Sequence, residues 1–164
     1  MLHKLKGGQP LPPRPTGTTI FKAMGFGMVG MLIVAGLANL SQMPLVLGSF
    51  GATCVILGFP DTPFAQPRNI IGGHMISSAV GLLCLFLFGP EWWAMAIAVA
   101  VAIGLMHITR LVHPPAGSNP VIVMLAQPGW SFLLFPTLTG AVLLVLVALV
   151  YHNLPSDKSY PRYW

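Results

Sequence analysis

Charged residues are scarce in this chain: they make up 7% of its 164 residues, and only three of them are acidic. A soluble domain carries about 25% charged residues, so this chain cannot cover a globule with a solvated surface. So few carboxylates also leave no pair for hydrolytic acid–base chemistry or for a sodium or calcium site. These shortages exclude a soluble enzyme and a disordered linker. We expect no catalytic residues and no cofactor.

Cysteine is also rare, and both cysteines lie inside apolar runs. Cys54 and Cys84 therefore imply neither a disulfide framework nor a zinc site, and we expect them to pack as small buried hydrophobic residues. The five histidines share no helical face with cysteine or carboxylate partners, so we predict no metal site. A cleavable signal peptide is not expected, because residues 1–19 lack an apolar stretch.

Apolar residues and glycine are abundant, at 55% of the chain and 18 residues respectively, and the formal net charge is +5. The basic residues flank apolar runs and form no stripe, so we expect no nucleic-acid partner. The composition instead predicts an integral membrane protein whose surroundings are the lipid bilayer. Glycine-rich helix faces favour close helix contacts, and a homo-oligomer is a further expectation.

Four apolar runs, at about 22–40, 69–88, 92–110 and 131–151, are long enough to cross a bilayer as helices. Two shorter segments, 45–59 and about 116–126, each follow proline and predict short or broken helices. We therefore predict an all-α membrane protein, a helical bundle of four long transmembrane helices plus two short or broken membrane segments. The predicted divisions are an N-terminal tail (1–19), a transmembrane domain (20–152) and a C-terminal tail (153–164).

The positions of the basic residues bear on whether the short segments cross the membrane. If only the four long runs cross and the N-terminus is cytoplasmic, Arg68 and Arg110 fall on the outside. If the short segments also carry the chain across, all eight basic residues face the cytoplasm, as the positive-inside rule favours. We prefer six membrane segments with both termini cytoplasmic. Re-entrant short segments stay open as the alternative.

The two halves of the chain resemble each other loosely. GATCVI at 51–56 aligns with GSNPVI at 117–122, and each is followed by Ala-Gln-Pro, at 65–67 and at 126–128. The repeat units are about 20–88 and 92–152, and three crossings in each would make the second an inverted copy of the first. Inverted repeats with interrupted helices are a recurrent transporter design. The alternative is chance similarity between apolar sequences rich in small residues.

Three motifs occur in order: GSFGAT at 48–53, AQPRNIIGGH at 65–74 and MHITRLVHPPAG at 106–117. Together they resemble the hallmark regions of the HPP family of bacterial and plastid integral membrane proteins. The resemblance implies a multi-pass protein of the bacterial inner membrane that acts as a transporter. Because some relatives are linked to nitrite movement, it also makes nitrite the first cargo to consider.

The starts of the two short segments predict an anion site. Unpaired N–H groups and the positive dipole end of a broken helix stabilise a small anion without a full counter-charge. The predicted donors are Ser49, Gly51 and Thr53 in the first half, and Gly117, Ser118 and Asn119 in the second. The alternative is that these hydroxyl and amide groups only cap or back-bond the short helices.

Ionisable residues at membrane depth usually face a cavity, and three of them are spaced i, i+3, i+6. His107, Arg110 and His113 would lie along one side of the fourth long helix if that helix continues so far. The alternatives are that Arg110 snorkels to lipid headgroups and that the histidines satisfy nearby carbonyl groups.

Three further residues begin the third long helix or lie within it. Arg68 and Asn69 would form an anion-attracting vestibule, in which Asp61 pairs with Arg68; the alternative for Arg68 is a positive-inside anchor. His74 is a candidate for proton movement near neutral pH, or it only satisfies neighbouring carbonyl groups.

These features together predict a membrane transporter or channel for a small inorganic anion, with nitrite as the best guess. The sequence pattern indicates no nucleophile paired with a general base, so we do not expect an enzyme. Two alternatives stay open: a proton- or cation-linked pathway, and a non-transporting sensor or assembly subunit.

Overall fold

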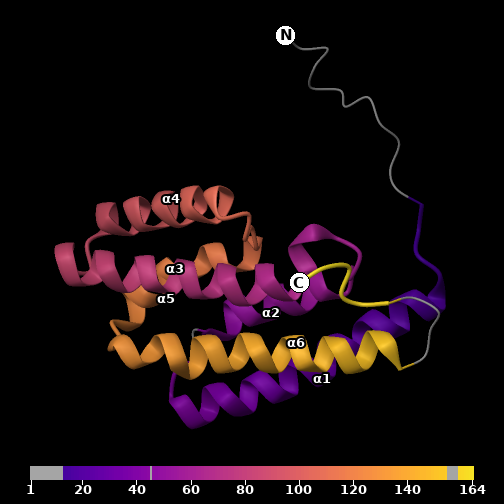
Figure 1. Ribbon diagram of the computed structural model, residues 1–164. Coiled ribbons are helices and arrows are strands. Elements are labelled where there is room, and N and C mark those ends of the chain that lie inside the picture. The colour runs from indigo at the N-terminus through magenta and orange to yellow at the C-terminus, as the bar shows by residue number, and fades with distance from the viewer. Residues whose placement is uncertain (1–12, 45, 155–158) are drawn as a thin grey trace, which may run out of the picture.

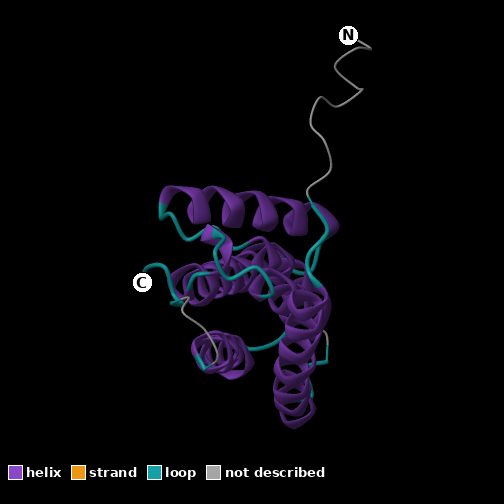
Figure 2. Cartoon of the chain, turned by 90° about the vertical axis from the view of Figure 1, so that its right-hand side faces the viewer, coloured by secondary structure: helices purple, strands orange, loops and turns teal. Residues whose placement is uncertain are grey.

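The computed structural model describes residues 13–44, 46–154 and 159–164, and within them the regular structure is helical (Figures 1 and 2). The prediction of an all-α chain is therefore confirmed for these residues. The α-helices are α1 (Gly17–Ser41), α2 (Val46–Leu57), α3 (Pro67–Phe88), α4 (Trp92–Ile108), α5 (Asn119–Ala126) and α6 (Thr139–Asn153). Short 3-10 or π-helical turns occupy Pro63–Ala65, Pro114–Ser118, Trp130–Leu133 and Leu134–Leu138.

Three segments in the described part are long and apolar enough to cross a membrane: α1, α3 and Trp130–Asn153, which ends in α6. The predicted fourth long helix, α4, is apolar but has only 17 residues, or about 26 Å of helix. By length, the structure thus supports three of the four predicted long spans. The start of α1 and the end of α6 lie at the same end of the bundle, while the α3–α4 turn lies at the opposite end (Figure 1).

The two short segments form the short helices that the proline positions predict. α2 has 12 residues and α5 has eight, so they are about 18 Å and 12 Å long and neither covers a hydrocarbon core of about 30 Å. Pro120 lies in the first turn of α5, where its missing N–H removes no helical hydrogen bond. Both helices pack inside the bundle, α2 against α1 and α5 against α3.

Helix α3 has α4 on one side and the helices α1 and α6 on the other (Figures 1 and 2). Small side chains let α4 pack closely on α3. Ala94, Ala98 and Ala102 recur every four residues along α4 and are fully buried, so they form one stripe. The stripe packs with Val80 and Cys84 of α3. By contrast, most of α1 exposes large apolar side chains, as expected for a helix surface that faces lipid.

Candidate functional site

Polar side chains gather where α2, α3 and the segment leading into α5 meet. We define the central cluster as six residues, each at most 1% exposed: Ser49 and Thr53 of α2, His74 and Ser78 of α3, His113, and Asn119 of α5. Five of the six are residues that the sequence predicts for the site. Such a cluster is costly at membrane depth unless its members satisfy one another, and here they do.

Local geometry explains how these side chains come together. On α2 and on α3 the two cluster residues are four positions apart, so each pair shares one helical face. His113 lies beside α3 because residue 73 is glycine: a Cβ atom there would lie 2.7 Å from the Cβ of His113 and 3.0 Å from the carbonyl oxygen of Leu111. Gly73 is thus what allows the segment before α5 to approach α3.

The amide of Asn119 organises the inner half of the cluster. Its Oδ1 accepts a hydrogen bond from the Ser49 hydroxyl (2.6 Å), and its Nδ2 donates to Ser78 Oγ (2.8 Å) and to His74 Nδ1 (3.1 Å). An amide NH₂ group only donates, so His74 Nδ1 accepts and the proton of the neutral His74 ring is on Nε2. Asn119 therefore sets the tautomer of His74.

The outer half of the cluster runs from His74 to the turn before α3. His113 Nδ1 lies 2.7 Å from the carbonyl oxygen of Phe64, which only accepts, so Nδ1 carries the proton and Nε2 is an acceptor. Thr53 Oγ1 lies 3.0 Å from both His74 Nε2 and His113 Nε2. The single proton of the Thr53 hydroxyl has two acceptors at 3.0 Å, the carbonyl oxygen of Ser49 and His113 Nε2, so Thr53 accepts from His74 and donates onward to His113 when it turns from Ser49. In that state every bond from Asn119 to Phe64 has its donor on the same side.

The polar contacts extend along about half the length of α3. Ser78 is the twelfth of the 22 residues of α3 and lies 3.3 Å from the Thr137 hydroxyl. It lies eleven positions after the start of α3 at Pro67, which is about 16 Å along the helix. The cluster therefore connects the middle of the bundle with the end at which α3 begins.

No charged side chain among the described residues is buried with the cluster. Every charged side chain in residues 13–44, 46–154 and 159–164 is exposed, including those of Arg68 and Arg110. A charged group at Asn119 or His74 would consequently have no counter-ion among the described side chains.

Several residues predicted for the site lie outside the cluster. Ser118 is exposed and its hydroxyl donates to the carbonyl oxygen of Pro115 (2.9 Å), which is the local back-bonding role given as the alternative. Gly51 faces Met31 of α1, and Gly117 is half-buried. Asn69 lies at the edge of the cluster: its amide donates to the carbonyl oxygen of Val112 (3.0 Å), while its buried Oδ1 has no partner.

Two predictions about the basic residues are wrong. α4 ends at Ile108, and Arg110 takes a left-handed backbone conformation (φ 57°), so His107, Arg110 and His113 do not share one side of a helix. The chain turns there, which leaves His107 and Arg110 exposed and brings only His113 into the bundle. Asp61 does not pair with Arg68 as predicted.

Sequence reasoning missed two hydroxyls of the site. Ser78 and Thr137 are fully buried and contact each other. The available signal was the pair Ser77–Ser78 in the middle of an apolar span, where two adjacent hydroxyls need partners inside the protein. Ser77 donates to the carbonyl oxygen of Ala116 (2.6 Å), which ties α3 to the segment before α5.

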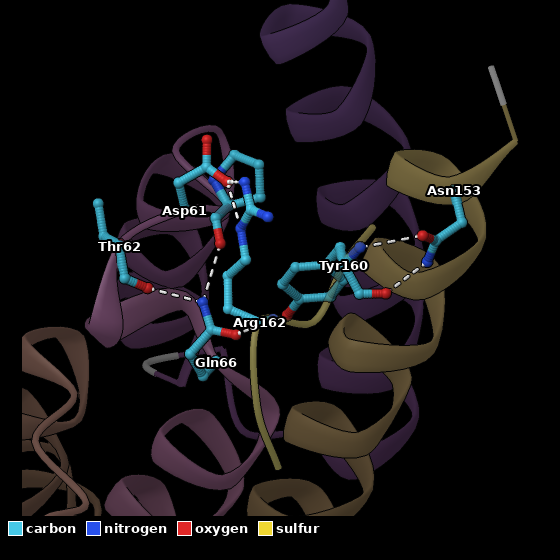
Figure 3. Close-up of polar contacts among 7 residues, drawn as sticks. Asp61, Thr62, Gln66, Asn153, Tyr160 and Arg162 are labelled. Atoms are coloured by element: carbon cyan, nitrogen blue, oxygen red, sulfur yellow. Dashed lines mark hydrogen bonds and ion pairs between the residues drawn. The ribbon is translucent and has the colours of Figure 1, made fainter. Parts of the chain in front are cut away.

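The C-terminal residues 159–164 lie against the turn that precedes α3 (Figure 3). The Tyr160 hydroxyl donates to the carbonyl oxygen of Ala65 (2.7 Å), and the Arg162 backbone N–H donates to Gln66 Oε1 (2.7 Å). Arg162 also pairs with Asp61 (2.6 Å), in place of the predicted partner Arg68. The tail thereby holds the turn that contains Phe64, the last acceptor of the cluster.

Replacing Tyr160 by phenylalanine should cost about 1 kcal/mol of unfolding free energy at neutral pH, because the Ala65 carbonyl loses its donor. Burial raises the pKa of the Tyr160 phenol, so the neutral form is favoured in the folded state. Its contribution is full below a pH of about 10, the pKa of an unfolded tyrosine, and is lost as the pH rises further. Melting of the detergent-solubilised protein between pH 8 and 11 measures this loss.

The control for this prediction is Tyr163→Phe. The Tyr163 side chain is exposed and its hydroxyl lies 3.4 Å from the carbonyl oxygen of Pro63, so its removal should change little. The prediction is contradicted if Tyr160→Phe keeps the alkaline loss of stability seen in the natural protein.

The sequence matches the model of a transmembrane family and two curated transmembrane proteins. The profile of a family described as "HPP, transmembrane region" matches residues 12–161. A transmembrane protein of Dictyostelium discoideum is 38% identical over 133 residues, covering 76% of this chain and 47% of that protein. A second Dictyostelium transmembrane protein is 33% identical over 174 aligned positions, covering 98% and 56%. The chain thus spans about half the length of these curated relatives. No solved structure matches it.

Proposed function

The chain belongs to the HPP transmembrane family, and from this premise we propose that it is a multi-pass transporter for a small inorganic anion, with the central cluster as its site. The observation that carries the proposal is an uncharged, fully buried hydrogen-bonded cluster in the middle of an apolar bundle. Polar groups at membrane depth usually mark a substrate pathway. Neutral donors suit an anion that must also leave, because a full counter-charge would trap it.

The cargo class follows from the kind of groups that meet in the cluster. The hydroxyls of Ser49 and Ser78 both contact the amide of Asn119, so the donors of these three side chains can turn toward one small anion. No carboxylate lies in the cluster to bind a metal cation. Nitrite is the first candidate, and chloride, nitrate and formate are competitors of similar size and charge.

The architecture that we propose for transport is an inverted repeat. A short helix lies between two longer segments in α1–α2–α3, and again in α4, α5 and Trp130–Asn153, the segment that ends in α6. The two short helices meet at the cluster, where Ser49 of α2 donates to Asn119 of α5. A site between the interrupted helices of two inverted units is a common arrangement in transporters.

The membrane orientation is a further part of the proposal. Lys22, Arg68, Arg110 and Arg162 lie on segments that begin or end at one end of the bundle, and Glu91 lies at the other (Figure 1). By the positive-inside rule the basic end, with both termini, is cytoplasmic. The bacterial inner membrane and a homo-oligomeric state stay predictions; the two curated relatives are from Dictyostelium discoideum.

Flux into proteoliposomes tests the proposal. Purified protein should give saturable nitrite uptake above that of protein-free liposomes, and chloride, nitrate or formate should compete with it. Ser49→Ala should lower uptake about tenfold because it leaves Asn119 Oδ1 buried without a donor. The matched control is Ser118→Ala, whose hydroxyl contacts only its own turn.

The alternatives predict other results. Folded protein that moves none of these anions contradicts an anion transporter. Such protein would instead favour a proton- or cation-linked pathway if it still passed protons or cations, and a sensor or assembly subunit if it passed neither.

A further inference from the structure

We propose that one proton moves with each monovalent anion, and that His74, Thr53 and His113 carry it between the middle of the bundle and its α3-start end. This inference rests on the proposed function, because it concerns the same site. It identifies the coupling ion of the transporter and the side chains that conduct it.

The geometry supplies an unbroken path for the proton. His74 Nε2, Thr53 Oγ1 and His113 Nε2 are joined by two contacts of 3.0 Å, and His113 Nδ1 lies 2.7 Å from the carbonyl oxygen of Phe64. An imidazole can accept a proton at one ring nitrogen and release one from the other, and a hydroxyl oxygen can accept a proton while it releases its own. The three side chains can therefore pass a proton in series. Phe64 lies in an exposed turn, where the path reaches the end of the bundle.

The proton balance of one passage is simple. A neutral acid that reaches the middle of the cluster gives its proton to His74 Nδ1 and becomes the anion, while the Asn119 amide turns from His74 to the anion. His74 passes its Nε2 proton to Thr53 Oγ1, and Thr53 passes its own proton to His113 Nε2. His113 then turns its Nδ1–H from the Phe64 carbonyl oxygen, which cannot relay a proton, and releases this proton to water at the α3-start end as the anion leaves the cluster. One proton enters the cluster and one leaves it, and no bare anion stays buried. Exchange with water then returns the ring proton of His74 from Nδ1 to Nε2 and that of His113 from Nε2 to Nδ1, and the Thr53 hydroxyl turns back.

A proton must accompany the anion because no charged side chain in the described part of the chain is buried with the cluster. A bare anion in the cluster would be a buried charge without a partner, which is strongly unfavourable. The groups that face His74 are Ser49, Phe50 and Thr53 from α2, Asn119 from α5, and His113. Among these only His113 is an ionisable residue, so a proton carried by one of the two histidines is the positive charge that the described groups around His74 can offer.

The test measures protons and anions together. Proteoliposomes that contain a pH-sensitive dye are given nitrite outside, and potassium with valinomycin sets the membrane potential. We expect uptake to acidify the interior by one proton per nitrite, beyond the change in protein-free liposomes, and to be insensitive to the potential. Thr53→Val, which keeps the shape but removes the hydroxyl, should lower proton-coupled uptake about tenfold. Thr53→Ser, which restores the hydroxyl, should retain most of it.

The outcomes separate this inference from the proposed function. Nitrite uptake that follows the potential without acidifying the interior overturns the inference alone, and so does proton-coupled uptake in Thr53→Val at the rate of the natural protein. Absence of any anion flux from folded protein overturns the proposed function, and this inference with it. A readout independent of transport is the ¹⁵N NMR of the histidines in lipid. We expect the Nε2–H tautomer for His74 and the Nδ1–H tautomer for His113, and the reverse pair contradicts the path.

Discussion

Replacing Asn119 by alanine is expected to lower the free energy of unfolding by about 2–4 kcal/mol, since three buried partners lose hydrogen bonds. The Ser49 hydroxyl loses the shorter of its two acceptor contacts and keeps only the Pro115 carbonyl oxygen (3.1 Å), while His74 Nδ1 and Ser78 Oγ lose their donor. Because Asn119 also sets the tautomer of His74, nitrite uptake should fall at least about tenfold in the same preparation. Denaturant unfolding in detergent and flux in proteoliposomes measure the two effects.

A matched control for this prediction is Asn39→Ala. Asn39 lies near the end of α1 and its side chain is exposed, so we expect stability to change by less than about 0.5 kcal/mol. If the two alanine variants unfold at the same denaturant concentration, the Asn119 contacts do not stabilise the protein as argued.

Conserving the side-chain shape with Asn119→Asp should not restore uptake, because a carboxylate cannot donate to His74 and would be a buried charge.

Replacing Gly73 by alanine is the second change with a large expected effect. The new Cβ would lie 2.7 Å from the Cβ of His113 and 3.0 Å from the Leu111 carbonyl oxygen, and neither atom can move without shifting the backbone. We expect a loss of about 2–3 kcal/mol in unfolding free energy, as in other overpacked sites. His113 would also move away from Thr53, so uptake should fall together with stability.

Two other glycines, Gly72 in α3 and Gly104 in α4, provide controls for Gly73→Ala. At Gly72 a Cβ would meet only the side chain of Leu111, whose methyl groups can rotate away, so the cost should be smaller. At Gly104 nothing lies within 4 Å, and alanine should stabilise α4 by up to about 1 kcal/mol through its helix propensity. Equal losses at Gly72 and Gly73 would show that the position of His113 does not depend on this close approach.

Composition and local pattern alone predict the class of this protein and the order of its segments. Few charges, long apolar runs and prolines before two shorter runs are properties of neighbouring residues, and they determine transfer free energy and helix starts directly. The same local logic identified five of the six cluster residues, because a serine, threonine, asparagine or histidine in an apolar segment is conspicuous. It also predicted the short helices that became α2 and α5.

Only the tertiary structure decides which of those polar residues meet. Ser49 and Asn119 are 70 positions apart, and Thr53 and His113 are 60 apart, so their contacts depend on how helices pack. The i, i+3, i+6 spacing predicted that His107, Arg110 and His113 lie on one side of a helix. That prediction is wrong because α4 ends at Ile108, and a helical spacing has meaning only while the helix continues. The direction of the hydrogen bonds follows from the Phe64 carbonyl and the Asn119 amide at the two ends of the chain of contacts. Neither is visible until packing brings them next to the histidines.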